Sequence, residues 1–173
     1  MDPFYITIEL VPENRKTIQA SLKGNVCAIK FPKPWLNRKR YLAPMVDRIY
    51  WRLLGRIYNR ELQRRTIDLN DKYFGFYYKI VTYHRQFRRW GSCSSLRNIH
   101  LSHRLIEAPQ TLQDYVIIHE LAHLEHLNHS RDFWSLVKTT GFDPKIIRRE
   151  IEIYGRAWNT RYFKWYEDLL KKL

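Results

Sequence analysis

Two histidines four residues apart, His119 and His123, lie in a segment that is otherwise strongly apolar. Its neighbours Tyr115–Ile118 and Leu121 predict a helix that packs into a protein core. Residues four apart share one face of a helix, so both imidazoles can bind one ion. Burying two imidazoles and the Glu120 carboxyl without partners is costly, and a metal ion removes that cost. The sequence therefore predicts a buried, metal-binding helix.

Glu120 lies about 100° around this helix from His119. From that position its carboxylate can reach a metal-bound water without itself binding the ion. The ion lowers the pKa of such a water toward about 7, and the carboxylate takes and delivers the proton. This arrangement predicts metal-assisted hydrolysis with Glu120 as the catalytic base.

A catalytic tetrahedral ion takes three protein ligands and keeps one position for water, so a third ligand must lie outside the histidine pair. His126 shares the helix face, but it lies about 10 Å along the axis from His119. His129 follows Asn128, a residue that readily adopts the left-handed conformation at helix ends, and a chain that turns there brings His129 back to the ion. The remaining candidates are carboxylates of a later helix, Glu150 or Glu152.

The N-terminal part of the chain predicts a small sheet. Phe4–Leu10 alternates apolar and polar residues, as a half-buried strand does. Residues 17–22 and 26–31 flank Lys23-Gly24-Asn25, a pattern typical of a β-hairpin. A long helix is expected next, over about residues 41–65, where apolar residues recur at helical spacing.

The remainder of the chain mixes strands and helices. Tyr77–Tyr83 and Asn98–His103 predict strands, and residues 88–95 between them predict a tight loop. Pro109 begins the metal-binding helix, which is expected to run to about His126. Further helices are expected at about residues 131–140, 146–155 and 158–173. The pattern predicts a single α+β domain over residues 1–173.

The charge of the chain is strongly basic but unevenly distributed. Lys and Arg total 31 against 17 Asp and Glu, which gives a formal net charge of +14. Residues 109–140 instead have a net charge of −2 and hold four of the seven histidines. A basic excess favours a nucleic-acid partner, or it serves solubility alone. On the long helix, arginines recur every four residues and form either a solvated face or a ridge that contacts phosphates: Arg48, Arg52, Arg56, Arg60 and Arg64.

Composition also excludes several classes of protein. No apolar run approaches the roughly 18 residues that a membrane span needs. Cys27 and Cys93 do not make a disulfide framework. Residues 1–4 lack the basic and apolar regions of a secretory signal. We therefore expect a cytoplasmic protein with no membrane partner.

The metal-binding segment resembles that of a known family. His119-Glu120-Leu121-Ala122-His123, followed by His129-Ser130 and Phe133-Trp134, is similar to the YgjP-like metallopeptidase domain, a group of zincins. A more distant similarity connects this histidine spacing to WLM- and SprT-type proteases, which degrade proteins crosslinked to DNA.

The resemblance extends upstream. Arg89-Trp90-Gly91-Ser92-Cys93-Ser94, with Ile99 and Leu101 after it, is similar to the loop-and-strand signature of that family. Asn14-Arg15-Lys16-Thr17 is similar to its opening. The resemblance covers about residues 14–158 and leaves a C-terminal helical extension over residues 159–173.

The resemblance implies a zincin-like fold and a zinc-dependent metallopeptidase that hydrolyses peptide bonds of a protein or peptide substrate. It implies His119, His123 and His129 as zinc ligands and Glu120 as the catalytic base. It also implies that the strand at about Ile99–His103 is the active-site edge strand, which aligns a substrate by strand addition. The substrate-facing residues of that strand would be Ile99, Leu101 and His103.

Other interpretations remain open at this stage. The chain could be a basic nucleic-acid-binding protein with a structural zinc ion, in which case four protein ligands are expected instead of three. A protease brought to nucleic acid by its basic flanks combines both. Cys93 is a packed residue or a redox-sensitive or metal-capping thiolate. His103 or Tyr83 are candidates to hydrogen-bond an oxyanion, and Phe133 and Trp134 are expected to support the metal-binding helix.

Overall fold

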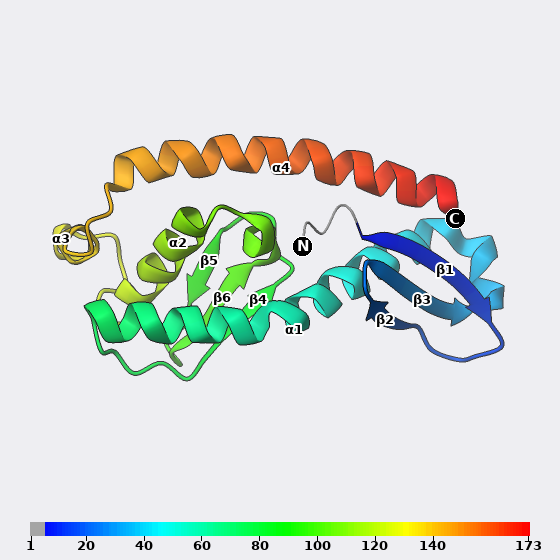
Figure 1. The fold of residues 1–173 in the computed structure, drawn as a ribbon, viewed down its shortest axis with the longest axis horizontal. Helices are drawn as coiled ribbons and strands as arrows, with labels where there is room; N and C mark the ends of the chain where they lie inside the picture. The colour runs from blue at the N-terminus through cyan, green and yellow to red at the C-terminus, as the bar shows by residue number, and fades with distance from the viewer. Residues whose placement is uncertain (1–5) are drawn as a thin grey trace. The chain divides into compact units, whose positions relative to one another are not determined.

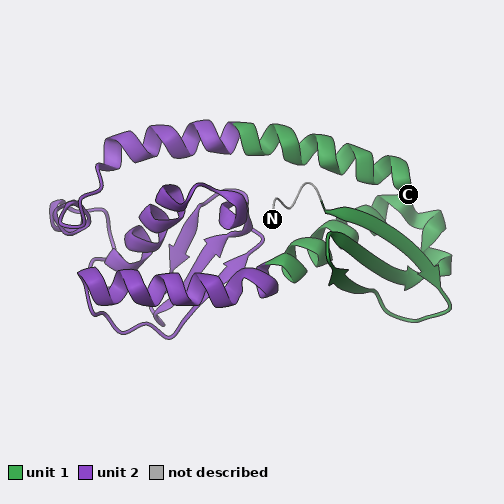
Figure 2. Cartoon of the chain, viewed as in Figure 1, with its two compact units in different colours: residues 1–54, 157–173 green, residues 55–156 purple. Residues whose placement is uncertain are grey.

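The computed structural model describes residues 6–173, which form an α+β protein as the sequence predicts (Figure 1). The chain forms two compact units, one of residues 1–54 with 157–173 and one of residues 55–156 (Figure 2). Two long helices, α1 (Lys39–Tyr73) and α4 (Pro144–Lys172), contribute a part to each unit. The expectation of a single domain stays a prediction.

The first unit contains the predicted hairpin. Its sheet has the order β1-β3-β2, with β2 antiparallel and β1 parallel to β3. Gly24 has a φ of +58° in the β2–β3 turn, a conformation that glycine adopts without steric cost. The sequence predicts the first strand over Phe4–Leu10, and the observed strand begins at Thr7. Phe4 and Tyr5 lie outside the described part of the chain. The strands are β1 (Thr7–Glu13), β2 (Gln19–Lys23) and β3 (Val26–Pro32), and the 3-10 helix η2 (Lys33–Arg38) follows them.

Aromatic residues join the two helices of the first unit. Trp158 of α4 is fully buried, and its ring centroid lies 5.7 Å from that of Trp51 of α1. Trp165 stacks on Tyr50 at 5.2 Å. The Tyr162 hydroxyl donates a hydrogen bond to Oδ1 of the buried Asp47, at 3.2 Å. The aromatic residues of the C-terminal part of α4 therefore pack onto α1.

The second unit contains a sheet of order β4-β6-β5. Its middle strand β6 (Asn98–Ser102) pairs in parallel with β4 (Ile80–His84) and antiparallel with β5 (Gly91–Cys93). The prediction of an edge strand at Ile99–His103 is therefore wrong, because both sides of β6 are already paired. Ile99 and Leu101 are fully buried, and His103 lies buried in the 3-10 helix η3 (His103–Glu107). The edges of this sheet are β4 and β5, and β5, which lines the pocket described below, lies within the segment expected to be a loop.

Helix α2 (Gln110–Ala122) packs onto this sheet and against α3 (Arg131–Lys138). The second part of α1 and the first part of α4 contribute residues to the same hydrophobic core. The Ser130 hydroxyl caps α3 by accepting a hydrogen bond from the Phe133 backbone N–H at 3.3 Å. The expected break between two C-terminal helices is absent, because α4 continues through Gly155. A Cβ at Gly155 would lie 2.8 Å from Cζ2 of Trp90, so this glycine permits a close approach and does not end the helix.

None of the described helices combines the length and apolar character needed to cross a bilayer. Cys27 and Cys93 are both free thiols.

A charged pair ties α1 to α2 within the second unit. Arg65 binds Asp114 through two hydrogen bonds, from Nε at 2.7 Å and from Nη2 at 2.5 Å. Gln110 donates a third hydrogen bond to the same carboxylate at 2.8 Å. The Asp114 side chain is 11% exposed, so the pair is only partly screened by solvent.

We expect Asp114→Asn to lower the free energy of unfolding by about 1–2 kcal/mol, because it removes a charge-assisted, two-pronged interaction. Urea unfolding measures this change. The matched control is Asp168→Asn, whose partner Lys171 is exposed, and its effect should stay below about 0.5 kcal/mol. Equal losses in the two variants would contradict the structural role of the Arg65–Asp114 pair.

Candidate metal centre

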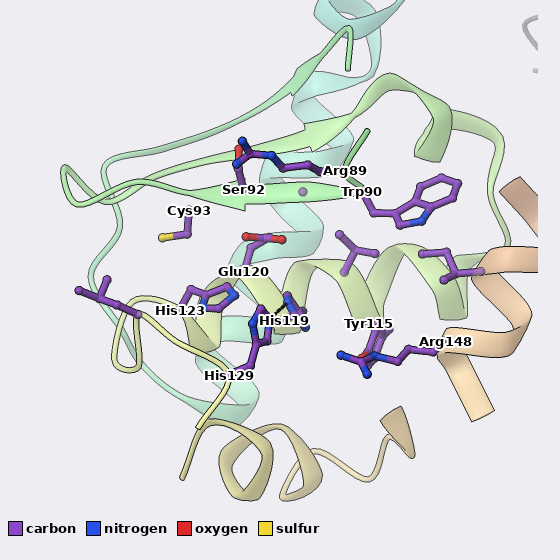
Figure 3. Close-up of a pocket in the computed structure, with 14 residues that line it drawn as sticks. Arg89, Trp90, Ser92, Cys93, Tyr115, His119, Glu120, His123, His129 and Arg148 are labelled. Carbon is purple, nitrogen blue, oxygen red and sulfur yellow. Dashed lines mark hydrogen bonds between the residues drawn. The ribbon is translucent and has the colours of Figure 1, made fainter. Parts of the chain in front are cut away.

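A pocket of about 420 Å³ lies where α2, β5 and the first part of α4 meet (Figure 3). The residues that line it are Arg89, Trp90, Gly91, Ser92, Cys93, Tyr115, Val116, His119, Glu120, His123, Leu127, His129, Arg148 and Ile151. All of them belong to the second unit.

Three histidines converge on one side of this pocket. His119 lies on the last turn of α2, His123 is its C-cap, and His129 comes from the following loop. One ring nitrogen of each lies within 4.8 Å of the other two. Nε2 of His119 and Nε2 of His129 are 3.0 Å apart. The structure therefore brings together the three histidines that the sequence singles out.

The turn after α2 brings His129 back toward the helix. The His126 backbone N–H still donates to the Ala122 carbonyl at 3.0 Å, and the chain then leaves the helix axis. Asn128 does not adopt the expected left-handed conformation, since Arg97 is the non-glycine residue with positive φ among the described residues. Its side chain instead accepts a hydrogen bond from the Ser130 N–H at 3.2 Å. A side-chain turn thus replaces the backbone turn that the sequence suggests.

The other candidates for a third ligand do not join the cluster among the described residues. The His126 carbonyl accepts a hydrogen bond from Nδ1 of His123 at 2.9 Å, so His126 contributes its backbone and not its ring. Since Nδ1 of His123 carries the proton, its Nε2 lone pair is left for an ion. Glu150 and Glu152 are exposed on α4.

Phe133 of α3 lies against all three imidazoles. It is fully buried, and its ring centroid is 4.9 Å from that of His119, 4.5 Å from that of His123 and 4.8 Å from that of His129. Trp134 stacks on His129 at 5.3 Å. The expectation that these aromatic residues support the metal-binding helix agrees with their contacts.

The Glu120 carboxyl lies directly beneath β5 (Figure 3). A Cβ built on Gly91 would be 2.7 Å from Cδ of Glu120 and closer still to Oε1, so a larger residue at this position of the strand would displace the carboxyl. Glu120 is 4% exposed, and its Oε2 has no hydrogen-bond partner among the described residues. A buried acceptor of this kind is ready to bind a water or a substrate N–H.

Trp90 fixes the beginning of β5. The Arg104 guanidinium lies 3.8 Å from the centroid of the Trp90 ring and donates to the Arg89 carbonyl at 3.3 Å. Tyr154 packs beside the same indole and donates its hydroxyl proton to the Arg104 carbonyl at 2.5 Å. Three side chains therefore hold the strand that covers Glu120.

Burial controls the electrostatics of the site. It raises the pKa of Glu120 to about 8, against the opposing charge of Arg89. Burial also lowers the pKa of His119 to about 3, with smaller contributions from His123 and His129. The neutral imidazole is the form that binds a metal, so burial favours the ligating form of His119.

The remaining predicted site residues lie elsewhere. Tyr83 donates to Oε1 of Gln113 at 3.4 Å, and Nδ1 of His103 accepts from the Gln86 N–H at 3.2 Å, so neither lines the pocket. Cys93 lines the pocket, but it is not part of the described metal cluster, and burial raises its pKa to about 11. The arginine row of α1 is exposed along its whole length: Arg48, Arg52, Arg56, Arg60 and Arg64.

The pocket also contains residues that sequence reasoning missed. Tyr115 precedes His119 by one helical turn, a spacing that could have placed it on the same face. Arg89 adjoins the Trp90-Gly91 segment. Arg148 comes from α4, and no local signal connects it to the histidines.

The model of the family described as YgjP-like, metallopeptidase domain, matches residues 10–152. The chain belongs to this family. The match covers the strand, loop and helix that form the pocket, and it confirms the resemblance seen in the sequence. Membership assigns the chain to the metallopeptidases and implies that its site takes a metal.

Comparison with solved structures finds similarity to the metallopeptidase zymogen jannalysin of Methanocaldococcus jannaschii. The two chains are 18% identical with a TM-score of 0.44, over 53% of this chain and 90% of that chain. No curated protein matches the sequence.

The residues present fit a zinc-type ion. Three imidazole nitrogens are a typical zinc donor set, and tetrahedral ligands at 2.0–2.1 Å from zinc lie about 3.3 Å apart. The observed 3.0 Å between the Nε2 atoms of His119 and His129 is close to this spacing. The hydrogen bond from His123 to the His126 carbonyl orients its ring as such ligands require.

We expect the protein to bind about one divalent ion per chain, and alanine at position 119, 123 or 129 to weaken binding by at least about 10²-fold. Metal analysis and competition with a chelating dye measure both. His126→Ala is the matched control, because its ring is outside the cluster, and it should keep the ion. Loss of the ion in His126→Ala together with its retention in His129→Ala would reverse the ligand assignment.

Proposed function

We propose that the chain is a zinc-dependent metallopeptidase with His119, His123 and His129 as ligands and Glu120 as the catalytic base. The observation that carries this proposal is the placement of one buried carboxyl beside three convergent imidazoles in a single pocket. A zinc ion bound there supplies a Lewis acid that polarises the peptide carbonyl and lowers the pKa of water.

Glu120 would take the proton from the attacking water and deliver it to the leaving amine. Its Oε2 has no competing hydrogen bond among the described residues, so that atom can accept the proton. A bound cation favours the charged form of a nearby carboxyl, which opposes the effect of burial on the Glu120 pKa. A bound ion therefore favours the ionised form of Glu120, which is the form that acts as a base.

The substrate would extend along β5. This strand has β6 on one side only, and its residues Gly91–Cys93 line the pocket. An extended peptide can add to such an edge through backbone hydrogen bonds. We therefore assign the alignment of the substrate to β5, and not to Ile99 and Leu101 of β6.

The alternative, a structural zinc site, requires a fourth protein ligand. Among the residues that the structure describes, the cluster holds three histidines and no further His, Cys, Asp or Glu. This favours catalysis over a structural role.

We expect Glu120→Gln to keep the metal and to lose peptide turnover by about 10²–10⁴-fold, because an amide cannot take the proton. Metal analysis and cleavage of a denatured protein substrate test the two parts separately. Glu125→Gln is the control, since Glu125 is exposed and outside the pocket, and it should cleave normally. Retained turnover in Glu120→Gln would remove the base assignment.

We also propose that the exposed arginine row of α1 attracts nucleic acid, so that substrates bound to it are brought near the site. All five arginines of the row are exposed, Arg48 and Arg52 in the first unit and Arg56, Arg60 and Arg64 in the second. Cations spaced along a helix can neutralise several phosphates and release their counterions.

Replacement of Arg56, Arg60 and Arg64 by Gln should reduce the salt dependence of binding to a DNA duplex, because fewer phosphates are neutralised. The slope of log affinity against log salt should become shallower by roughly 0.9 for each phosphate that is no longer neutralised. Anisotropy titrations at several salt concentrations measure this slope. An unchanged slope would assign the row to solvation alone.

A further inference from the structure

Two arginines line the pocket beside the histidine cluster. Arg89 lies on the β5 side and Arg148 on the α4 side (Figure 3). The pocket-lining residues include a single carboxyl, that of Glu120, which packs against Gly91. Neither arginine forms a described ion pair with a carboxylate. The pocket therefore has an excess of positive charge before any ion binds.

Arg148 packs against an aromatic side chain at the wall of the pocket. Its guanidinium carbon lies 4.6 Å from the centroid of the Trp134 ring. Tyr115 lines the same pocket, and the positive charge of Arg148 opposes the effect of burial on its pKa. Arg89 has no comparable side-chain contact in the described structure, so Arg148 is the more preorganised of the two cations.

The two aromatic partners of Arg148 also contact the histidine cluster. Trp134 stacks on His129 at 5.3 Å, and the Tyr115 ring centroid lies 6.0 Å from that of His119. The guanidinium is thus one side chain away from the imidazoles. A group bound by Arg148 would belong to a substrate residue about one or two positions from the reacting bond, since each extended residue spans roughly 3.3–3.6 Å.

We propose that Arg148 binds a carboxylate of the substrate, so that the enzyme prefers peptides with an acidic group close to the cleaved bond. A guanidinium matches a carboxylate through two parallel hydrogen bonds, and an oriented guanidinium loses little entropy when it binds. The carboxylate comes either from an Asp or Glu side chain or from the C-terminus of the peptide. This specificity rests on the proposed peptidase function.

An acidic peptide fits this site better than a nucleic acid does. Recognition of a nucleic-acid backbone uses several cations spaced along the phosphates. Arg148 is a single guanidinium that lines a pocket of about 420 Å³ and packs on Trp134. Its surroundings, with an edge strand on one side and aromatic rings on the other, suit one peptide segment.

The experiment compares Arg148→Gln with Arg149→Gln, which removes the same charge from the neighbouring exposed residue outside the pocket. Four peptides of one sequence provide the arms: one with Glu beside the cleaved bond, one with Gln there, and two that end at that position, as a free acid and as an amide. We expect Arg148→Gln to lower kcat/KM about 10–100-fold for whichever acidic peptide is the better substrate. For the Gln-containing peptide and for the amidated peptide, kcat/KM should change less than about twofold. Arg149→Gln should cleave all of them like the unaltered protein.

Binding provides a readout that does not depend on turnover. The Glu120→Gln protein, loaded with zinc, should bind the acidic peptide more tightly than the neutral one, and Arg148→Gln added to it should abolish that difference. Arg148→Lys keeps the charge and the packing stem but not the paired hydrogen bonds, so it should restore only part of the preference. It also guards against a folding defect in Arg148→Gln.

Several outcomes would overturn the proposal. Equal losses of kcat/KM for acidic and neutral peptides in Arg148→Gln would give Arg148 a structural role. If Arg148→Gln weakens DNA binding as much as it weakens binding of the acidic peptide, Arg148 is a general anion site. If the unaltered protein cleaves no peptide, the proposed function fails. The binding comparison still decides whether Arg148 recognises a carboxylate.

Discussion

The contact between the Glu120 carboxyl and the backbone of Gly91 determines how the rest of the site is arranged. It sets the distance between the end of α2 and β5, because a Cβ at position 91 would overlap the carboxyl group. The strand is held in turn by Trp90, which lies between Arg104 and α4. A side chain at Gly155 would displace the indole. Two glycines far apart in the sequence thus allow one buried carboxyl to lie under an edge strand.

The features that the sequence predicts well depend on local interactions. The spacing of His119 and His123 in an apolar run determines that both imidazoles share the buried face of one helix. The hairpin follows from a turn residue, Gly24, between two short strands. Ser130 caps α3 through a hydrogen bond three residues away. In each case the residues that decide the structure lie within about one helical turn of each other, so the pattern is visible in the chain.

The wrong predictions concern residues whose partners are distant in sequence or whose side chains replace the backbone in a turn. The order of strands in the sheet of the second unit cannot be read from any one strand, so β6 resembles an edge strand in sequence. The sequence pattern ends a helix at Gly155, although this glycine contacts Trp90, which lies 65 positions earlier. Asn128 makes its turn through its side chain and not through a left-handed backbone. Arg148 has no local signal because its partners, Tyr115 and Trp134, belong to other helices.

The net charge of +14 and the charge of the pocket act over different distances. Exposed charges such as those of the arginine row are screened beyond about 8 Å at physiological salt, so they influence mainly the encounter with an anionic partner. The proposed interaction of Arg148 with a substrate carboxylate acts at hydrogen-bond distance, where a guanidinium discriminates between a carboxylate and an amide. Salt should therefore weaken the first effect far more than the second. A basic surface and a selective pocket are separable properties of this chain, and only the pocket bears on which bond is cleaved.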